Sequence, residues 1–180
     1  MNLYYIFYIK LNAIIIKVRA LKNFYFFKNL STIIGKNLTI RTGAGKHIFG
    51  NKNIILDNVI FEVYNPKASI QTGNYCMFAF GVVISCCKNI TIGDHVWIGE
   101  YTSIRDSTHI FSKNSPLGSL PDKIESIKIG NNVWIGRGCL IMQGVTIEDN
   151  VVIAANSVVK GNILTGNIYG GVPAKFLKKL

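Results

Sequence analysis

Acidic residues are scarce in this chain of 180 residues: nine Asp and Glu stand against 20 Lys and Arg, for a formal net charge of +11. Between Met1 and Leu56 there are nine Lys or Arg and no acid. So basic a block is attracted to an anionic surface, whether phospholipid, lipid-linked sugar phosphate or nucleic acid. No RNA- or DNA-binding motif accompanies it, so we expect no nucleic-acid partner. A solvated basic face without any partner is an equally simple interpretation.

Cysteine is also sparse, and its positions lack the paired CxxC spacing typical of a metal site. Two of the four cysteines are adjacent, and most fall where side chains are expected to face a core. This pattern favours free thiols in a reducing cytoplasm over disulfides or bound metal, so we expect a cytoplasmic protein. The four positions are Cys76, Cys86, Cys87 and Cys139.

A long uninterrupted apolar run is absent as well. Residues 1–30 are apolar and aromatic, but Lys10 and Lys17 interrupt any run approaching the roughly 18 residues that cross a bilayer. No small-residue cleavage site follows, so a signal peptide is not expected either. The two lysines share one face of a helix, which predicts a basic amphipathic helical segment. This segment either caps the N-terminal end of the domain that follows or makes a peripheral contact with the inner face of the membrane.

What the sequence does contain is an aliphatic residue at every sixth position between residues 129 and 159. Neither a helix, with spacings of three and four, nor an alternating antiparallel strand explains a strict period of six. A hexapeptide repeat supplies one short strand and one bend per unit, so three units close a triangular coil and successive coils stack as parallel strands. The period therefore predicts an all-β parallel β-helix. Its markers are Ile129, Ile135, Ile141, Ile147, Ile153 and Val159, with a second register at Ile92, Ile98 and Ile104.

Two stretches depart from this period. Between residues 31 and 75 the sixfold step is blurred, and the separation of Ile40 from Ile54 is not a multiple of six, which requires an insertion or a bulge. Residues 111–126 break the repeat with two prolines and several small polar residues, which predicts a protruding loop. The apolar run between these stretches is expected to fill the coil interior, with Phe80, Ile84, Cys86 and Ile90 facing inward.

The chain resembles the hexapeptide-repeat acyltransferases from about Asn74 to Lys179. The shared motifs are IGDHVWIG (92–99), DSTH (106–109), IGNNVWIG (129–136), VTIEDNVVIAANSVVKG (145–161) and GGVPAK (170–175). The resemblance implies a left-handed parallel β-helix over residues 31–180, behind the helical segment at 1–30, assembled as a homotrimer with active sites between subunits. It further implies transfer of an acetyl group from acetyl-CoA to a sugar hydroxyl of a bacterial surface glycan, of capsule, O-antigen or sialic acid type.

His109 is the candidate general base. Acyl transfer from a thioester to an alcohol needs a base for the hydroxyl proton, and an imidazole is mostly neutral at pH 7 yet able to accept one. Strand alternation places His109 outward between an inward Thr108 and Ile110, at the base of the loop, where the resemblance also implies a catalytic histidine. Asp106, at the preceding bend, either orients this imidazole or caps its own backbone. Arg105 either meets an acidic sugar or occupies an exposed corner.

Trp97 and Trp134 occupy equivalent places in two repeat units and are expected to face outward. Because an exposed indole is costly, each is expected to be covered by another molecule. A neighbouring subunit is the expected cover of Trp97, whereas the resemblance places Trp134 beside the acetyl-CoA channel. Small outward residues beyond Trp134 let a thin pantetheine arm lie against backbone, although tight coil packing explains them equally well. Two lysines further on are candidates for the phosphates of the coenzyme. The expected cofactor-binding set is Trp134, Gly136, Ala154, Ala155, Lys160 and Lys175.

No metal is expected. The gamma-class carbonic anhydrases share the β-helix but bind zinc through three histidines that converge at one subunit boundary, and the three histidines of this chain are not spaced to do so. Two other functions stay open. One is N-acetylation of an amino sugar or small amine, and the other is a non-catalytic β-helix that binds anionic glycan through its basic face.

Overall fold

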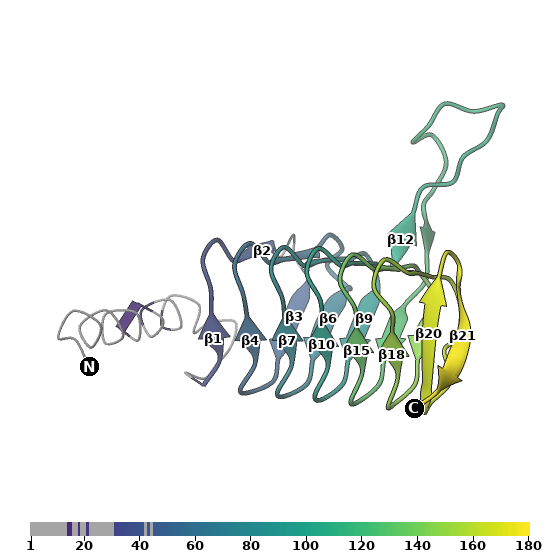
Figure 1. The fold of residues 1–180 in the computed structure, drawn as a ribbon. Coiled ribbons are helices and arrows are strands. Elements are labelled where there is room, and N and C mark those ends of the chain that lie inside the picture. The colour runs from purple at the N-terminus through teal and green to yellow at the C-terminus, as the bar shows by residue number, and fades with distance from the viewer. Residues whose placement is uncertain (1–13, 16–17, 19–20, 22–30, 42, 44) are drawn as a thin grey trace.

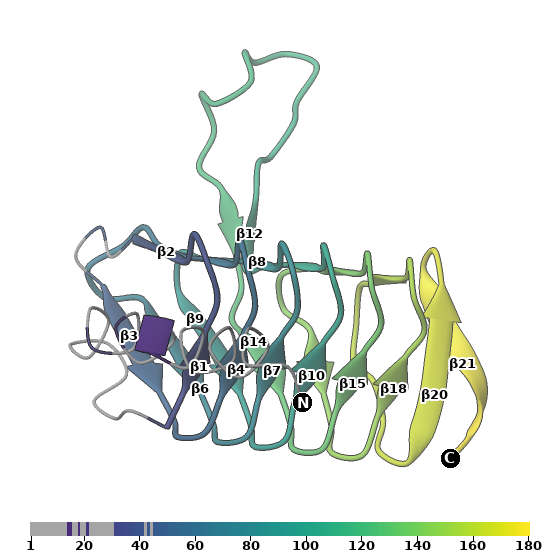
Figure 2. The same cartoon turned by 60° about the vertical axis from the view of Figure 1, so that its left-hand side comes forward.

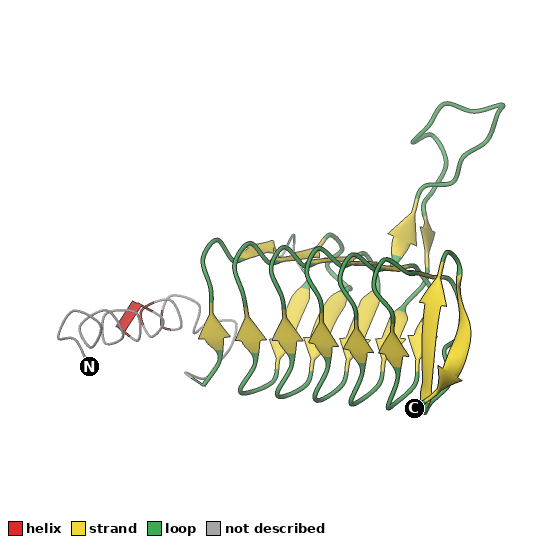
Figure 3. Cartoon of the chain, viewed as in Figure 1, coloured by secondary structure: helices red, strands yellow, loops and turns green. Residues whose placement is uncertain are grey.

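The computed structural model describes residues 14–15, 18, 21, 31–41, 43 and 45–180. Within them the chain is nearly all β and winds into a parallel β-helix of about six turns (Figures 1 and 3). The basic helical segment expected at residues 1–30 falls largely outside the described residues. In the part of the chain that the structure covers, no helix has the length and the apolar character needed to cross a membrane.

Short strands stack into the three faces of a triangular prism, and all pairings within a face are parallel except that of the last two strands. The first face contains β1 (Ile33–Ile34), β4 (Ile54–Ile55), β7 (Met77–Phe78), β10 (Trp97–Ile98), β15 (Trp134–Ile135), β18 (Val152–Ile153), β20 (Asn167–Gly171) and β21 (Ala174–Lys179). The second face contains β2 (Thr39–Arg41), β5 (Ile60–Val63), β8 (Val83–Cys86), β11 (Ser103–Arg105), β16 (Leu140–Ile141) and β19 (Val158–Val159). The third face contains β3 (Lys46–Phe49), β6 (Ser69–Thr72), β9 (Asn89–Ile92), β14 (Ile127–Ile129) and β17 (Thr146–Ile147).

Inward side chains stack in rows along the axis of the prism. Burying each of these side chains contributes about 1.5–3 kcal/mol, so the sixfold pattern supplies the main stabilisation of the coil. The left-handed parallel β-helix expected from the hexapeptide period is therefore confirmed. On the first face the buried row consists of Ile34, Ile55, Phe78, Ile98, Ile135 and Ile153.

Asn and Asp side chains tie successive turns together at one corner. Each side-chain oxygen accepts a hydrogen bond from a backbone N–H of the preceding turn, at N···O distances of 2.6 to 2.9 Å. Glycine stands just before all of these residues except Asp149, because the backbones approach closely there: a Cβ on Gly93 would lie 2.7 Å from the carbonyl oxygen of Gly130. The repeat motif of Ile and Gly followed by Asp or Asn thus marks the positions at which successive turns touch. The ladder runs through Asn51, Asn74, Asp94, Asn131 and Asp149.

The N-terminal turns are longer than three strict hexapeptides. On the first face Ile33 pairs with Ile54, and Ile54 pairs with Met77, so the insertion expected before Ile54 is confirmed. The next turn, from Met77 to its partner Trp97, also carries extra residues. Counting back in sixes from Ile92 therefore ends on Phe80 rather than on Phe78. The inward place expected for Phe80 is wrong, because Phe80 is 37% exposed and Phe78 is buried.

A β-hairpin, here called the arm, leaves the prism between the second and third faces. β12 (Ser107–Thr108) pairs antiparallel with β13 (Lys123–Ile124), and the chain between them projects well beyond the coils in both views (Figures 1 and 2). The protruding loop expected at residues 111–126 is confirmed, but the departure begins earlier, at Ser107. Ile110, expected to face inward, is 42% exposed because it already belongs to the arm.

Candidate active site

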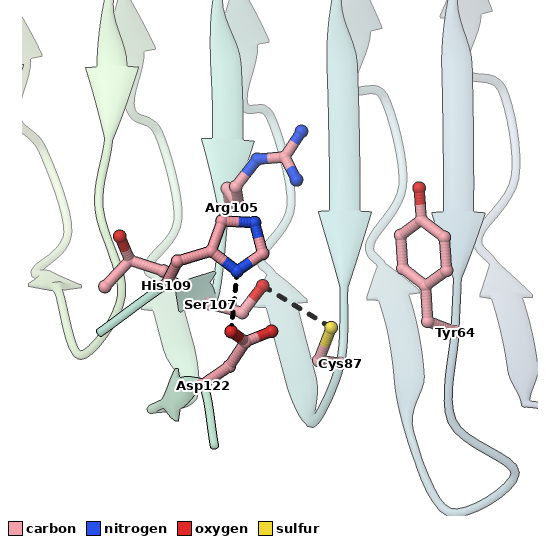
Figure 4. Close-up of a pocket in the computed structure, with 7 residues that line it drawn as sticks. Tyr64, Cys87, Arg105, Ser107, His109 and Asp122 are labelled. Atoms are coloured by element: carbon pink, nitrogen blue, oxygen red, sulfur yellow. Dashed lines mark hydrogen bonds and ion pairs between the residues drawn. The ribbon is translucent and has the colours of Figure 1, made fainter. Parts of the chain in front are cut away.

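A pocket of about 610 Å³ lies where the arm meets the prism (Figure 4). The end of β11, both sides of the arm and the corners that follow β5 and β8 contribute to it. Most of its side chains are polar or ionisable, as expected of a site that positions a reacting group rather than of a core. The lining residues are Tyr64, Cys87, Arg105, Ser107, Thr108, His109 and Asp122.

His109 and Asp122 form a hydrogen-bonded pair in this pocket. Nδ1 of His109 lies 2.7 Å from Oδ1 of Asp122, and the two side chains are 72% and 35% exposed. A carboxylate in contact with Nδ1 holds the proton of a neutral imidazole on that nitrogen. Nε2 then presents its lone pair to the pocket, which is the tautomer that a general base needs. The outward position expected for His109 is what the structure shows.

Asp106, the partner expected for His109, has a different place. It is fully buried, and its carboxylate accepts the backbone N–H groups of Cys87 at 2.6 Å and Lys88 at 2.8 Å. Its carbonyl oxygen accepts the N–H of Glu125 at 2.9 Å, where the arm returns. The expected pairing of Asp106 with the imidazole is therefore wrong. The alternative, a cap on its own backbone, is not what the structure shows either, because the carboxylate caps amides of the neighbouring turn. Buried amides outcompete a solvent-exposed ring for this carboxylate.

Sequence reasoning missed Asp122. It lies far beyond His109 in the chain and reaches the ring only because β12 and β13 pair. The one signal in the sequence is that residues 111–126, which break the repeat, contain only two acids, Asp122 and Glu125. Tyr64 and Cys87 were missed as well, since they enter the pocket from earlier turns.

Tyr64 and Glu62 extend the pocket along the second face. The phenol of Tyr64 donates to Oε2 of Glu62 at 2.6 Å, and the Arg41 guanidinium donates to Oε1 at 2.5 Å. Hydrogen bonding to Glu62, with some desolvation, raises the pKa of Tyr64 above its ordinary value, so the phenol stays protonated. Glu62 itself is buried, which is tolerated because both of its oxygens have donors.

A second hollow, here called the groove, of about 950 Å³ runs along the first face and is largely apolar. It brings together four residues of the expected cofactor-binding set, Trp134, Gly136, Ala154 and Ala155. Trp97 pairs in register with Trp134 and lines the same groove, and the two indoles are 54% and 58% exposed. Glycine is required at position 136, where a Cβ would lie 2.6 Å from the backbone nitrogen of Ala155.

Lys160 and Lys175 are not among the residues that line the groove, so their contact with coenzyme phosphates stays a prediction. Arg137 and Asn132 do line it and were missed, because both stand at corners that the apolar period does not mark. Arg137 supplies a cation at the groove wall, a natural partner for phosphate.

The pocket and the groove lie on different parts of the prism. The pocket opens at the corner between the second and third faces, whereas the groove follows the first face, opposite that corner. They share no lining residue. No group of three His, Cys, Asp or Glu suited to hold a metal ion occurs among the described residues.

A triangular prism of hexapeptide turns, with an outward histidine at the base of an expelled arm, defines the class of β-helical acyltransferases. Residues 126–161 match the family model described as bacterial transferase hexapeptide (six repeats). The chain is 31% identical over 163 residues to WbbJ of Escherichia coli strain K12, named a putative lipopolysaccharide biosynthesis O-acetyl transferase, covering 86% of this chain and 75% of that protein. It therefore belongs to the hexapeptide-repeat acyltransferase family.

Two solved structures are similar to most of the described chain. A hexapeptide-repeat acetyltransferase from Vibrio cholerae O1 biovar eltor, complexed with acetyl coenzyme A, has a TM-score of 0.62 and 27% identity, over 90% of this chain and 76% of that one. The N-acyltransferase AntD from Bacillus cereus, in complex with dTDP and 3-hydroxybutyryl-CoA, has a TM-score of 0.72 and 25% identity, over 83% of this chain and 80% of that one. Both of these structures hold an acyl derivative of coenzyme A.

Proposed function

We propose that this chain transfers the acetyl group of acetyl-CoA to a sugar hydroxyl of a bacterial surface glycan, with His109 as general base. The observation that carries the proposal is the 2.7 Å contact between His109 Nδ1 and Asp122 Oδ1 at the base of the arm. It supports a base whose free nitrogen faces a pocket wide enough for a sugar. The likeness to a lipopolysaccharide O-acetyl transferase supports a surface glycan as acceptor.

The reaction needs one proton transfer and one acyl transfer. Nε2 of His109 accepts the hydroxyl proton while the sugar oxygen attacks the thioester carbonyl, giving a tetrahedral oxyanion. Asp122 stabilises the imidazolium that forms. The carbon–sulfur bond then breaks, the imidazolium returns the proton to the departing thiolate, and the products are an O-acetyl sugar and free CoA. Direct attack is favoured because none of the described Ser or Cys side chains hydrogen-bonds to His109.

Acetyl-CoA fits the groove on the first face. The indole of Trp134 and the small side chains of Gly136, Ala154 and Ala155 leave a narrow, largely apolar channel along backbone. A long, thin pantetheine chain suits such a channel, and the nearby Arg137 suits a phosphate. Similarity to an acetyltransferase solved with acetyl coenzyme A supports this assignment.

We further propose that the active site forms between subunits of a homotrimer. Within one chain, the corner that carries His109 is opposite the face that carries the groove, so one copy does not bring base and thioester together. The outward row of the first face is apolar along the prism, which supports a covering subunit. This row consists of Ile33, Ile54, Met77, Trp97, Trp134 and Val152.

His109→Ala tests the mechanism. We expect release of thiol from acetyl-CoA in the presence of acceptor to fall by roughly 10²- to 10⁴-fold, the usual contribution of general-base catalysis, while the oligomer mass from light scattering is unchanged. Lys113→Ala, on the arm beyond the pocket, is the control and retains activity. Near-normal turnover in His109→Ala would remove His109 from the mechanism.

A second candidate is N-acylation of an amino sugar linked to a nucleotide, favoured by the similarity to AntD, which has also been solved as a mutant with dTDP-4-amino-4,6-dideoxyglucose and coenzyme A. Mild alkali separates the two, because an ester product is hydrolysed and an amide product survives. The absence of thiol release with any sugar would instead favour a non-catalytic, glycan-binding role for the basic face.

Residues 1–30 keep two proposed roles in a cytoplasmic protein, as a cap on the first turn or as a peripheral contact with the inner membrane. Sedimentation with anionic vesicles distinguishes them. Membrane contact predicts co-sedimentation that salt reverses, and a cap predicts none.

A further inference from the structure

Arg105 gives the pocket at the base of the arm a charge that the proposed acyl transfer does not use. Its side chain is exposed and lines the same pocket as His109 (Figure 4). Among the residues that the structure describes, no carboxylate forms an ion pair with its guanidinium. A guanidinium at a pocket wall with no internal partner is suited to bind carboxylate or phosphate through two parallel hydrogen bonds.

The neighbouring charges on the second face are already matched. Arg105 pairs in register with Ser85, Ser85 with Glu62, and Glu62 with Arg41. Glu62 accepts hydrogen bonds from Arg41 and from Tyr64, which occupy both of its carboxylate oxygens. Strands in a sheet are about 4.8 Å apart, so the row position of Glu62 lies roughly 10 Å from that of Arg105. Arg105 therefore keeps an unmatched positive charge.

The other ionisable groups of the pocket are engaged with one another. Asp122 is the only carboxylate among the lining residues, and it holds His109 at 2.7 Å. Once the imidazole has accepted the hydroxyl proton, imidazolium and carboxylate form a neutral pair. Tyr64 adds a neutral phenol, and its ring is 57% exposed and offers an apolar face to a sugar ring. When the acceptor binds, the imidazole is still neutral, but the carboxylate of Asp122 is engaged by His109, so Arg105 is the charged lining group left to contact the acceptor.

We propose that the acceptor carries an anionic group, a carboxylate or a phosphate, close to the hydroxyl that is acetylated, and that Arg105 binds this group. The proposal rests on the proposed function and narrows it to acidic sugars and sugar phosphates. Arg105 is then a residue that determines specificity. A neutral sugar gains no charge-assisted hydrogen bond from the guanidinium, so it is expected to bind more weakly than an anionic one.

Cys87 provides a reporter inside the same pocket. It is half-buried, lines the pocket and lies 3.4 Å from Ser107 Oγ through its Sγ atom. Burial raises the pKa of Cys76 to about 11 and that of Cys86 to about 12, and it also raises the pKa of Cys139. At pH 8 these three thiols are protonated and shielded. Alkylation of Cys87 by iodoacetamide, followed by peptide mass spectrometry, therefore reports occupancy of the pocket.

The test measures how strongly each sugar slows the alkylation of Cys87 by iodoacetamide, and it requires no turnover. Galacturonic acid and galactose 1-phosphate represent the carboxylate and the phosphate, and galactose is the neutral match. We expect at least one anion to slow alkylation at concentrations where galactose does not. In Arg105→Gln the protecting anion should be needed at roughly tenfold higher concentration, because a charge-assisted hydrogen bond is lost. Lys128→Gln, which removes a positive charge from β14 outside the pocket, is the matched control and should protect like the parent chain.

The outcomes separate the two proposals. Equal protection by galactose and the anions, undiminished protection in Arg105→Gln, or no protection by either anion up to saturation would overturn the anion site. Protection by galacturonic acid would identify a carboxylate as the group that Arg105 binds, and protection by galactose 1-phosphate would identify a phosphate. His109→Ala should keep the protection although it loses turnover. An active His109→Ala that is still protected would overturn the general base and leave the anion site standing.

Discussion

At the scale of single residues, the proposed chemistry depends on a carboxylate that the chain supplies well after the base. Asp122 meets His109 only because the arm turns back on itself. Asp122→Asn keeps the shape of the side chain but removes the charge that stabilises an imidazolium. We expect kcat to fall by at least roughly 10²-fold with little change in the free energy of unfolding. Steady-state thiol release and urea unfolding measure the two quantities.

Asp106→Asn provides the comparison for that variant. Its amide would meet the N–H groups of Cys87 and Lys88 with one acceptor instead of two, in a fully buried place. The expected effect is a loss of about 1–3 kcal/mol in the free energy of unfolding. The opposite result would be a lower kcat without loss of stability in Asp106→Asn, and a loss of stability without a lower kcat in Asp122→Asn. It would assign catalysis to Asp106 and a structural role to Asp122.

These two residues show how far sequence reasoning reaches at the site. The outward position of His109 was predicted correctly from strand alternation, but the structure gives it another cause, because the chain has already left the coil at Ser107. The sequence offered the nearest acid, Asp106, either as the partner of His109 or as a cap on its own backbone. The structure uses the more distant Asp122 instead, because a hairpin without any period decides which residues meet. The pairing within such a hairpin depends on contacts that no repeat encodes.

Trp134 belongs to the groove rather than to the pocket, so its loss should weaken one substrate selectively. In Trp134→Ala we expect the KM for acetyl-CoA to rise roughly tenfold, in line with the removal of an aromatic contact and its apolar area, while the KM for the acceptor changes little. Leu164→Ala, an equally exposed apolar change outside both hollows, is the control. A larger rise in the KM for the acceptor than in the KM for acetyl-CoA would place Trp134 at the acceptor site instead of the groove.

At the scale of elements, each turn of the coil is one unit, and the close contact between turns restricts which residues fit at its corners. A Cβ on Gly93 would lie 2.6 Å from Asn131 Oδ1 and 2.7 Å from the carbonyl oxygen of Gly130. Gly93→Ala should therefore lower the free energy of unfolding by about 1–3 kcal/mol, the usual cost of overpacking. Gly161→Ala is the control, since nothing lies within 4 Å of its added Cβ. Equal urea midpoints for the two variants would contradict this account of the motif.

The hexapeptide period predicted the positions of the strands correctly wherever the sixfold step is strict. Trp134 pairs with Val152, a separation of three hexapeptides, and the expected strands from Ile129 onward are in place. Farther toward the N-terminus each turn on the first face is longer than three hexapeptides, and the expectation for Phe80 failed there. Extra corner residues leave the inward rows intact, so apolar spacing alone does not show where they are added.

At the scale of the whole molecule, a site shared between copies makes a quantitative prediction. His109→Ala lacks the base, and Ala155→Trp fills the groove. Neither alone should turn over, but an equal mixture refolded together should regain roughly a quarter of parental activity, because a site needs an intact base from one copy and an intact groove from the next. Refolding each variant separately before mixing is the control and should stay inactive. Failure of the mixture to recover would place base and thioester in one chain.

The arm enters and leaves the prism at one corner, while β11 and β14 on either side of it keep their register with the turns above and below. The scaffold therefore places no demand on the number or kind of residues in the excursion. Lengthening or shortening that segment would reshape the pocket beside it while the stacked turns keep their pairing.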